Sequence, residues 1–227
     1  RDAYLRRIDG LVFGDNPRDG FFRGAEFLHP ELRFRLRFPD GWATQNQRQA
    51  VVAVSPPPGK DGMVQVSLAE RPSAEAAARA FVDQPGVTGG VSSRAAINGL
   101  PAVSAAFAAA TESGQLRGLA TFVEHGGRVF QLLALAPAAR WATHAAAAER
   151  AVRSFAVLTE RAALDVQPWR IAVVNADDAA TLEELARRRP PPAPVSVATL
   201  ALLNQMEPGA RLTAGTRLKW VVGQPRP

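Results

Sequence analysis

The feature that most constrains the fold is the strict alternation in residues 32–38, LRFRLRF. Every second residue is apolar, and the arginines between them, Arg33, Arg35 and Arg37, fall on the opposite face of an extended chain. This pattern is typical of a half-buried antiparallel strand. The arginine row could dock an acidic partner or an anionic glycan. It could also be the solvated face of an edge strand, where charge opposes aggregation.

Six more runs of strand type follow at nearly regular spacing, separated by turn sequences such as PPPGKDG, NGLP and GG. They are residues 50–55, 63–70, 90–97, 102–111, 116–125 and 128–136. Two helices interrupt them, at 73–82 with Ser73 as the expected N-cap and at 141–155 with Thr143 as a possible cap. An antiparallel sheet with helices packed on it predicts an α+β sandwich over residues 26–160.

The two ends of the chain differ from this middle region. Residues 161–227 contain a linker, then the order strand (169–174), helix (181–189), helix (196–206) and strand (216–222), a small βααβ unit. Residues 1–25 are charged and carry the turn signals Asn-Pro and Asp-Gly, so we expect a connector there.

Composition excludes several classes of function. The formal charge is +6, yet the basic residues are scattered and not interleaved with aromatics, which argues against a nucleic-acid-binding surface. No apolar run approaches the roughly 18 residues of a membrane span. The chain has no cysteine, so disulfides, thiol catalysis and thiolate metal sites are excluded.

We find no catalytic or metal-ligating motif. The histidines His29, His125 and His144 lie far apart, and none has a partner at the i+4 spacing of HExxH. No Gly-x-Ser-x-Gly elbow and no phosphate-binding loop is present. The acidic doublets at 177–178 and 183–184 diverge in direction, and helix N-termini favour such residues electrostatically.

The βααβ unit resembles a LysM module, through TLEELA, LALLNQM and ARLTAGTRLKWV, in which Asn204 and Gly215 are the most telling positions. The resemblance implies recognition of N-acetylglucosamine-containing glycans such as peptidoglycan in a shallow groove. The residues that would form its sugar hydrogen bonds are Asn175, Asp177, Asn204, Gln205 and Glu207. Turn formation and helix capping would equally explain these residues.

Residues 26–160, opening with HPELRFRLRFPDGW, resemble the PsbP-like α/β sandwich. With RIDGLVFGDNPRDG before it, the whole arrangement looks like the C-terminal, non-catalytic region of bacterial zinc metalloendopeptidases of the HtpX/BepA type. The resemblance implies an upstream peptidase domain that holds the zinc, and a periplasmic or secreted location. It implies no cofactor in this chain.

The function expected on this basis is accessory: the chain would position or regulate the peptidase by contacting its own peptidase domain, an envelope client protein or peptidoglycan. A stand-alone peptidoglycan-binding module with no link to proteolysis is the alternative. The third possibility, that the chain is itself an enzyme, has no motif to support it.

Overall fold

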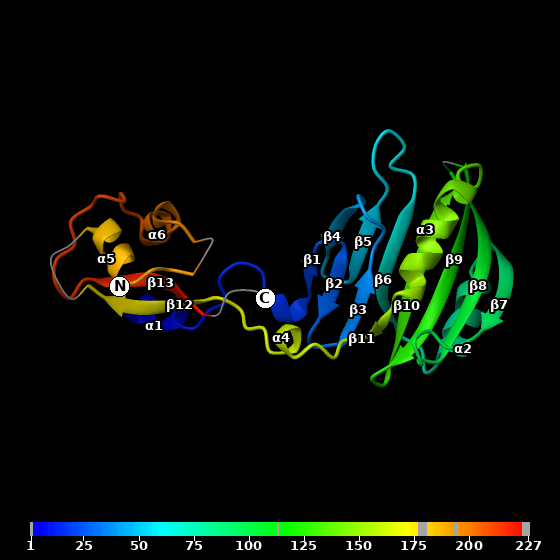
Figure 1. Ribbon diagram of the computed structural model, residues 1–227, viewed down its shortest axis with the longest axis horizontal. Coiled ribbons are helices and arrows are strands. Elements are labelled where there is room, and N and C mark those ends of the chain that lie inside the picture. Colours follow the sequence, from blue (N-terminus) through cyan, green and yellow to red (C-terminus); the bar gives the residue numbers. More distant parts are fainter. Residues whose placement is uncertain (1, 113, 177–180, 193–194, 224–227) are drawn as a thin grey trace. The chain divides into compact units, whose positions relative to one another are not determined.

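The computed structural model describes residues 2–112, 114–176, 181–192 and 195–223. The chain forms two compact units (Figure 1), which we call the sandwich unit, residues 20–160, and the terminal unit, residues 1–19 with 161–227. Both combine helices with antiparallel strands, so the predicted α+β class is confirmed. No helix in the described ranges is long and apolar enough to cross a membrane.

The sandwich unit contains two antiparallel sheets. The large sheet has the order β4-β5-β6-β10-β9-β8-β7 and the small one β1-β2-β3-β11. Their strands are β1 (Phe21–Arg23), β2 (Glu26–His29), β3 (Phe34–Arg37), β4 (Ala43–Asn46), β5 (Ala50–Val54), β6 (Met63–Ala69), β7 (Val87–Arg94), β8 (Ala102–Thr111), β9 (Gly114–His125), β10 (Arg128–Pro137) and β11 (Ala156–Val157). The strand runs expected from the sequence are therefore present.

One face of the large sheet is covered by the small sheet and by α3 (Trp141–Arg153). The centre of this core is aromatic: the Phe34 ring stacks on Phe155 with centroids 5.2 Å apart and touches Phe130 at 5.0 Å. Helix α3 begins after Arg140, which makes no side-chain cap, so the expected cap at Thr143 is wrong. The reason is that Trp141 and Ala142 already lie in the first helical turn.

The opposite face of the large sheet carries α2 (Ala74–Val82). Ser73 caps this helix as predicted, because its hydroxyl accepts the Ala76 amide. Phe81 packs edge-on against Phe107 with centroids 5.0 Å apart. The Phe107 ring in turn lies over Gly118, where an added Cβ would collide with it.

The terminal unit is built on the strand pair β12 (Arg170–Asn175) and β13 (Arg217–Val222), joined through α5 (Leu182–Arg188) and α6 (Val197–Asn204). A capping box between Thr181 and Glu184 starts α5. Ser196 starts α6. The predicted strand–helix–helix–strand order is thus present. Its core is formed by buried residues of all four elements, Val174, Leu182, Leu185, Leu200, Leu218 and Trp220.

The division of the chain differs from the predicted one at its beginning. Residues 1–19, which include α1 (Asp2–Ile8) and a 3-10 turn at Pro17–Asp19, group with the terminal unit, and β1 belongs to the small sheet of the sandwich. The cause is backbone hydrogen bonding along β12: the Gly10 amide donates to Ile171 (2.7 Å) and the Phe13 amide to Trp169 (2.7 Å). Phe13 also packs against the core of this unit.

Candidate functional site

The first of the two predicted glycan-binding loops follows β12 and lies against the turn that precedes β13 in the terminal unit. The amide of Ala176 donates to Thr216 (2.9 Å), and the amide of Gly215 donates back to Ala176 (2.7 Å). Asn175, Gln205 and Glu207 are exposed, whereas Asp177 lies outside the described residues. These bonds join Ala176 to the turn before β13, whereas the second loop, residues 204–207, is connected to β13 through Asn204 and Lys219. Three of the five residues face solvent.

Asn204 differs from the other candidates because its side chain is occupied by hydrogen bonds within the protein. Its amide nitrogen donates to the carbonyls of Leu200 and Lys219, both at 2.9 Å, and its amide oxygen accepts from the Lys219 amide at 2.8 Å. The two bonds with Lys219 tie the end of α6 to β13. The geometry gives Asn204 a structural function in this unit.

Gln205 is also shaped by the helix end. Its backbone is left-handed, with φ 55°, and its amide donates to the carbonyls of Ala201 and Leu202. It thus forms the C-cap of α6, as turn chemistry allows. Its side chain remains exposed.

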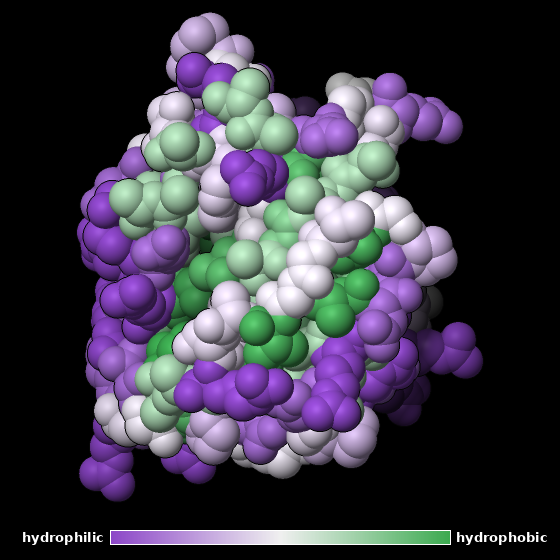
Figure 2. All heavy atoms as spheres, turned by 90° about the vertical axis from the view of Figure 1, so that its right-hand side faces the viewer, coloured by the Kyte–Doolittle hydropathy of each residue, from purple (hydrophilic) through white to green (hydrophobic). Residues whose placement is uncertain are grey.

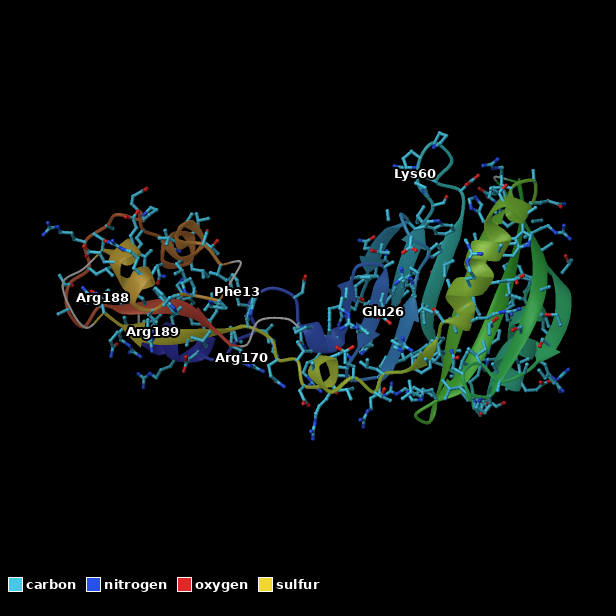
Figure 3. The ribbon with its side chains drawn as sticks, viewed as in Figure 1. Phe13, Glu26, Lys60, Arg170, Arg188 and Arg189 are labelled. Carbon is cyan, nitrogen blue, oxygen red and sulfur yellow. The ribbon has the colours of Figure 1, made fainter. Side chains whose placement is uncertain are left out.

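The arginine row on the small sheet is largely neutralised by acidic neighbours. Arg35 pairs with Glu26 at 3.0 Å, and Arg37 with Asp40 at 2.7 Å; Glu26 lies on β2 (Figure 3). Arg33 precedes β3 and has a left-handed backbone, φ 53°, so it does not continue the alternation. The row is therefore not a continuous positive stripe.

Arg23 strengthens this neutral network. Its guanidinium donates to both oxygens of Glu160 at 2.8 Å and to Glu26 at 3.2 Å. The hydrogen bonds from Arg23 hold the pKa of the Glu160 carboxyl below its usual range. This exposed ion pair joins the first strand of the sandwich unit to its last residue, Glu160.

The three histidines stay apart, and each ring has a hydrogen-bond partner within the protein. The ring of His29 accepts the Leu32 amide at 3.2 Å, and His125 Nε2 lies 3.0 Å from the Arg33 carbonyl oxygen. His144 donates from Nε2 to Asp61 Oδ1 at 2.8 Å. The described residues contain no group of three or more histidine or acidic side chains that could hold a metal ion.

The His144–Asp61 contact belongs to a polar cluster that the sequence did not predict. Asp61 also accepts from Arg140 Nε at 3.1 Å, and its backbone amide donates to the buried Ser55 hydroxyl at 3.1 Å. Hydrogen bonds from His144 and then Arg140 keep the pKa of the Asp61 carboxyl low. Trp42 packs edge-on against the His144 ring, at 5.6 Å.

This cluster contains serine, aspartate and histidine, but its order does not suit nucleophilic catalysis. The carboxylate stands between the hydroxyl and the imidazole: Ser55 Oγ donates to Asp61 Oδ1 at 3.4 Å and accepts the backbone amides of Asp61 and Gly62. His144 contacts the carboxylate and not the hydroxyl, so the Ser–His pair of a nucleophilic site is not formed by these residues. The arrangement braces the loop between β5 and β6 against the start of α3.

The sandwich unit has an open groove of about 560 Å³ between α3 and the β7–β9 part of the large sheet. Hydroxyl groups of Ser92, Ser93, Ser104 and Thr121 line it, and apolar contacts come from Ile97, Leu119 and Val152. Glu149 and Arg153 of α3 stand at its rim and pair at 3.8 Å. The groove has the size and mixed lining of a ligand site.

One end of this groove is closed by a tight turn. Ile97 and Leu100 exchange backbone hydrogen bonds at 2.9 Å, and Asn98 donates from its side chain to the carbonyls of Arg153 (2.9 Å) and Phe155 (2.8 Å). The turn is thereby fixed to the end of α3. The Asn-Gly signal predicted this turn, but the sequence held no signal for the groove it closes.

Comparison with solved structures finds similar folds. The chain is similar to the solution structure of a cyanobacterial PsbP from Synechocystis, with 14% identity and a TM-score of 0.46 over 60% of this chain and 94% of that one. It is also similar to LpqN of Mycobacterium tuberculosis, a protein involved in cell envelope biogenesis, with 18% identity and a TM-score of 0.42 over 69% and 96%. A putative regulator from Pseudomonas aeruginosa gives 22% identity and a TM-score of 0.40 over 53% and 88%.

At these identities and scores the likeness supports no argument about function. No protein-family model matches the chain. No curated protein matches it either.

Proposed function

We propose that this chain is the accessory, non-catalytic part of a secreted or periplasmic zinc metalloendopeptidase, which it positions or regulates through protein or cell-wall contacts. The observation that carries the accessory role is the groove of the sandwich unit. Its lining combines hydroxyls of β7, β8 and β9 with apolar side chains that include Ile97, Leu119 and Val152, and α3 adds the charged pair Glu149–Arg153, a mixture that suits binding. The link to the peptidase rests on the sequence resemblance of RIDGLVFGDNPRDG and HPELRFRLRFPDGW.

The experiment compares two purified proteins: this 227-residue chain and the longer protein that the proposal requires. Each is incubated with ZnCl₂ and reduced, unfolded α-lactalbumin, with and without a chelator. We expect chelator-sensitive cleavage by the longer protein alone. Cleavage by the 227-residue chain itself, or the lack of any chelator-sensitive cleavage by the longer protein, would overturn the proposal.

A stand-alone peptidoglycan-binding module is the second candidate. It is favoured by the exposure of Asn175, Gln205 and Glu207, three of the five residues that the LysM resemblance assigns to sugar binding. The chain is sedimented with insoluble peptidoglycan at low salt. Recovery in the pellet, reduced when all three residues are changed to alanine, supports this candidate, and recovery in the supernatant rejects it.

A further inference from the structure

The outer strand of the large sheet, β7, is open on one side. Among the described residues it pairs with β8 alone, so every second residue turns its backbone N–H and C=O away from the sheet. Natural proteins usually protect such edges with lysine, proline or a covering element. Residues 87–91, VTGGV, contain no charge and no proline. Val87 and Val91 are half-buried, and Thr88, Gly89 and Gly90 are exposed.

The glycines of β7 leave this edge accessible from both faces. Gly89 is required by the strand itself, because an added Cβ would collide with the carbonyl oxygen of Ala106. At Gly90 an added Cβ would meet nothing within 4 Å. The Val87 and Val91 side chains pack against the core under α2 and hold the strand in place.

The groove beside α3 lies next to this edge. Register places Gly90, Ala106 and Leu119 in one row across β7, β8 and β9, and Thr88, Ala108 and Arg117 in the next row. Both rows face the α3 side of the sheet, since Leu119 lines the groove and side chains alternate along β9. Figure 2 looks onto the end of the sandwich unit that carries β7, and hydrophobic surface gathers in its middle inside a hydrophilic rim.

We propose that β7 and this groove form a binding site for an extended peptide segment, which adds to the large sheet as a further strand. Backbone hydrogen bonds to the open edge of residues 87–91 supply the affinity, as in other strand-addition sites. A side chain beside Gly90 enters the groove toward Leu119 and is therefore apolar. A side chain beside Thr88 lies in the same row and on the same face of the sheet as the exposed Arg117, with the two backbones about 14 Å apart. Long acidic and arginine side chains bring the two charges within a Debye length, so an acidic residue is favoured there.

The proposed partner thus carries an apolar and an acidic side chain two positions apart on an extended segment. This site goes beyond the proposed accessory function and does not depend on the link to a peptidase. Its test therefore fails or succeeds independently of the cleavage experiment.

The probe is a library of random decapeptides, selected on the immobilised 227-residue chain. We expect enriched sequences to share the apolar–x–acidic spacing and, as synthetic peptides, to slow hydrogen exchange of the β7 amides by about tenfold or more at saturation. No enrichment, protection confined to other elements, or a helical conformation of the bound peptide would overturn the proposal.

Two pairs of variants connect binding to the edge and to Arg117. Gly90→Lys places an ammonium group at the open edge, and we expect peptide affinity to fall by about tenfold. Gly209→Lys is the matched control, because it adds the same charge in open space on the terminal unit, and it leaves affinity within about twofold. Equal affinity for both variants would contradict the site.

Arg117→Glu tests the acidic preference without changing β7. We expect this variant to bind the enriched acidic peptides with lower affinity than the unchanged chain does. We expect it to bind the same peptides more tightly when lysine replaces their acidic residue. Arg128→Glu is the control, because it makes the same charge change at the far end of β9 and β10. Arg128 pairs with His125, eight residues along β9 from Arg117. We expect this control to leave the affinity for the acidic peptides and for the lysine peptides unchanged. An acidic preference that survives Arg117→Glu would contradict this part of the proposal.

Discussion

Replacing Asn204 with alanine separates a structural role of this residue from a role in glycan binding. The change removes three hydrogen bonds, one to Leu200 within α6 and two that join α6 to the backbone of Lys219 on β13. Each such bond contributes about 1 kcal/mol net, and a backbone group left without a partner adds to the loss. We therefore expect the free energy of unfolding of the terminal unit to fall by about 2–4 kcal/mol.

Native-state hydrogen exchange of the β12 and β13 amides measures this change, because it reports the opening of the terminal unit separately from the sandwich unit. Leu202→Ala on the same helix is the control: Leu202 is 80% exposed, so the expected change is within about 0.5 kcal/mol. Unchanged β13 exchange in Asn204→Ala, together with lost peptidoglycan binding, would refute the structural assignment. Weaker binding only in proportion to the unfolded fraction would agree with it.

Three further predictions concern stability. Gly118→Val forces a branched side chain against the Phe107 ring and the Ala134 carbonyl, so thermal unfolding should show a loss of about 3 kcal/mol or more in the sandwich unit, and wild-type stability would contradict the packing. Thr181→Ala removes the capping box of α5, and the free energy of unfolding of the terminal unit should fall by about 1 kcal/mol. Chemical denaturation measures this change, and an unchanged free energy of unfolding would exclude a stabilising cap. Acid titration followed by circular dichroism should show the fold losing stability as the pH falls through about 4. The reason is that three carboxyls have a lower pKa in the folded state than in the unfolded state, so they stabilise the fold fully only above their unfolded pKa values. A fold that becomes more stable on acidification would contradict this direction. The three carboxyls are Asp61, Glu75 and Glu160.

Local patterns predicted much of the secondary structure. The period-two runs became strands, and Ser73 caps its helix as predicted, because strand alternation and capping involve only residues close in sequence. Arg33 did not follow the alternation, because its backbone is left-handed and β3 begins only at the next residue, Phe34. Nothing in the spacing of LRFRLRF distinguishes that position from Arg35.

The polar cluster and the groove depend on contacts between distant residues. Asp61 and His144 are 83 positions apart, and neither belongs to a motif. The groove exists because of the position at which α3 packs on the sheet. Contacts between residues far apart in sequence determine that position, so no short stretch of the sequence predicts it. The path of residues 9–13 beside β12 was missed because the segment is too short and too rich in turn residues to show a strand pattern.

The ion pair between Arg23 and Glu160 has a consequence for the order of folding. The hydrogen bonds that join the start of the terminal unit to β12 link residues 160 positions apart. Once the sandwich has folded, Arg23 and Glu160 are held together, and the connection that must close shrinks to about 20 flexible residues, which lowers the closure cost by about 2 kcal/mol. We therefore expect the inserted sandwich to fold first and to act as a template that brings the two halves of the terminal unit within reach of each other.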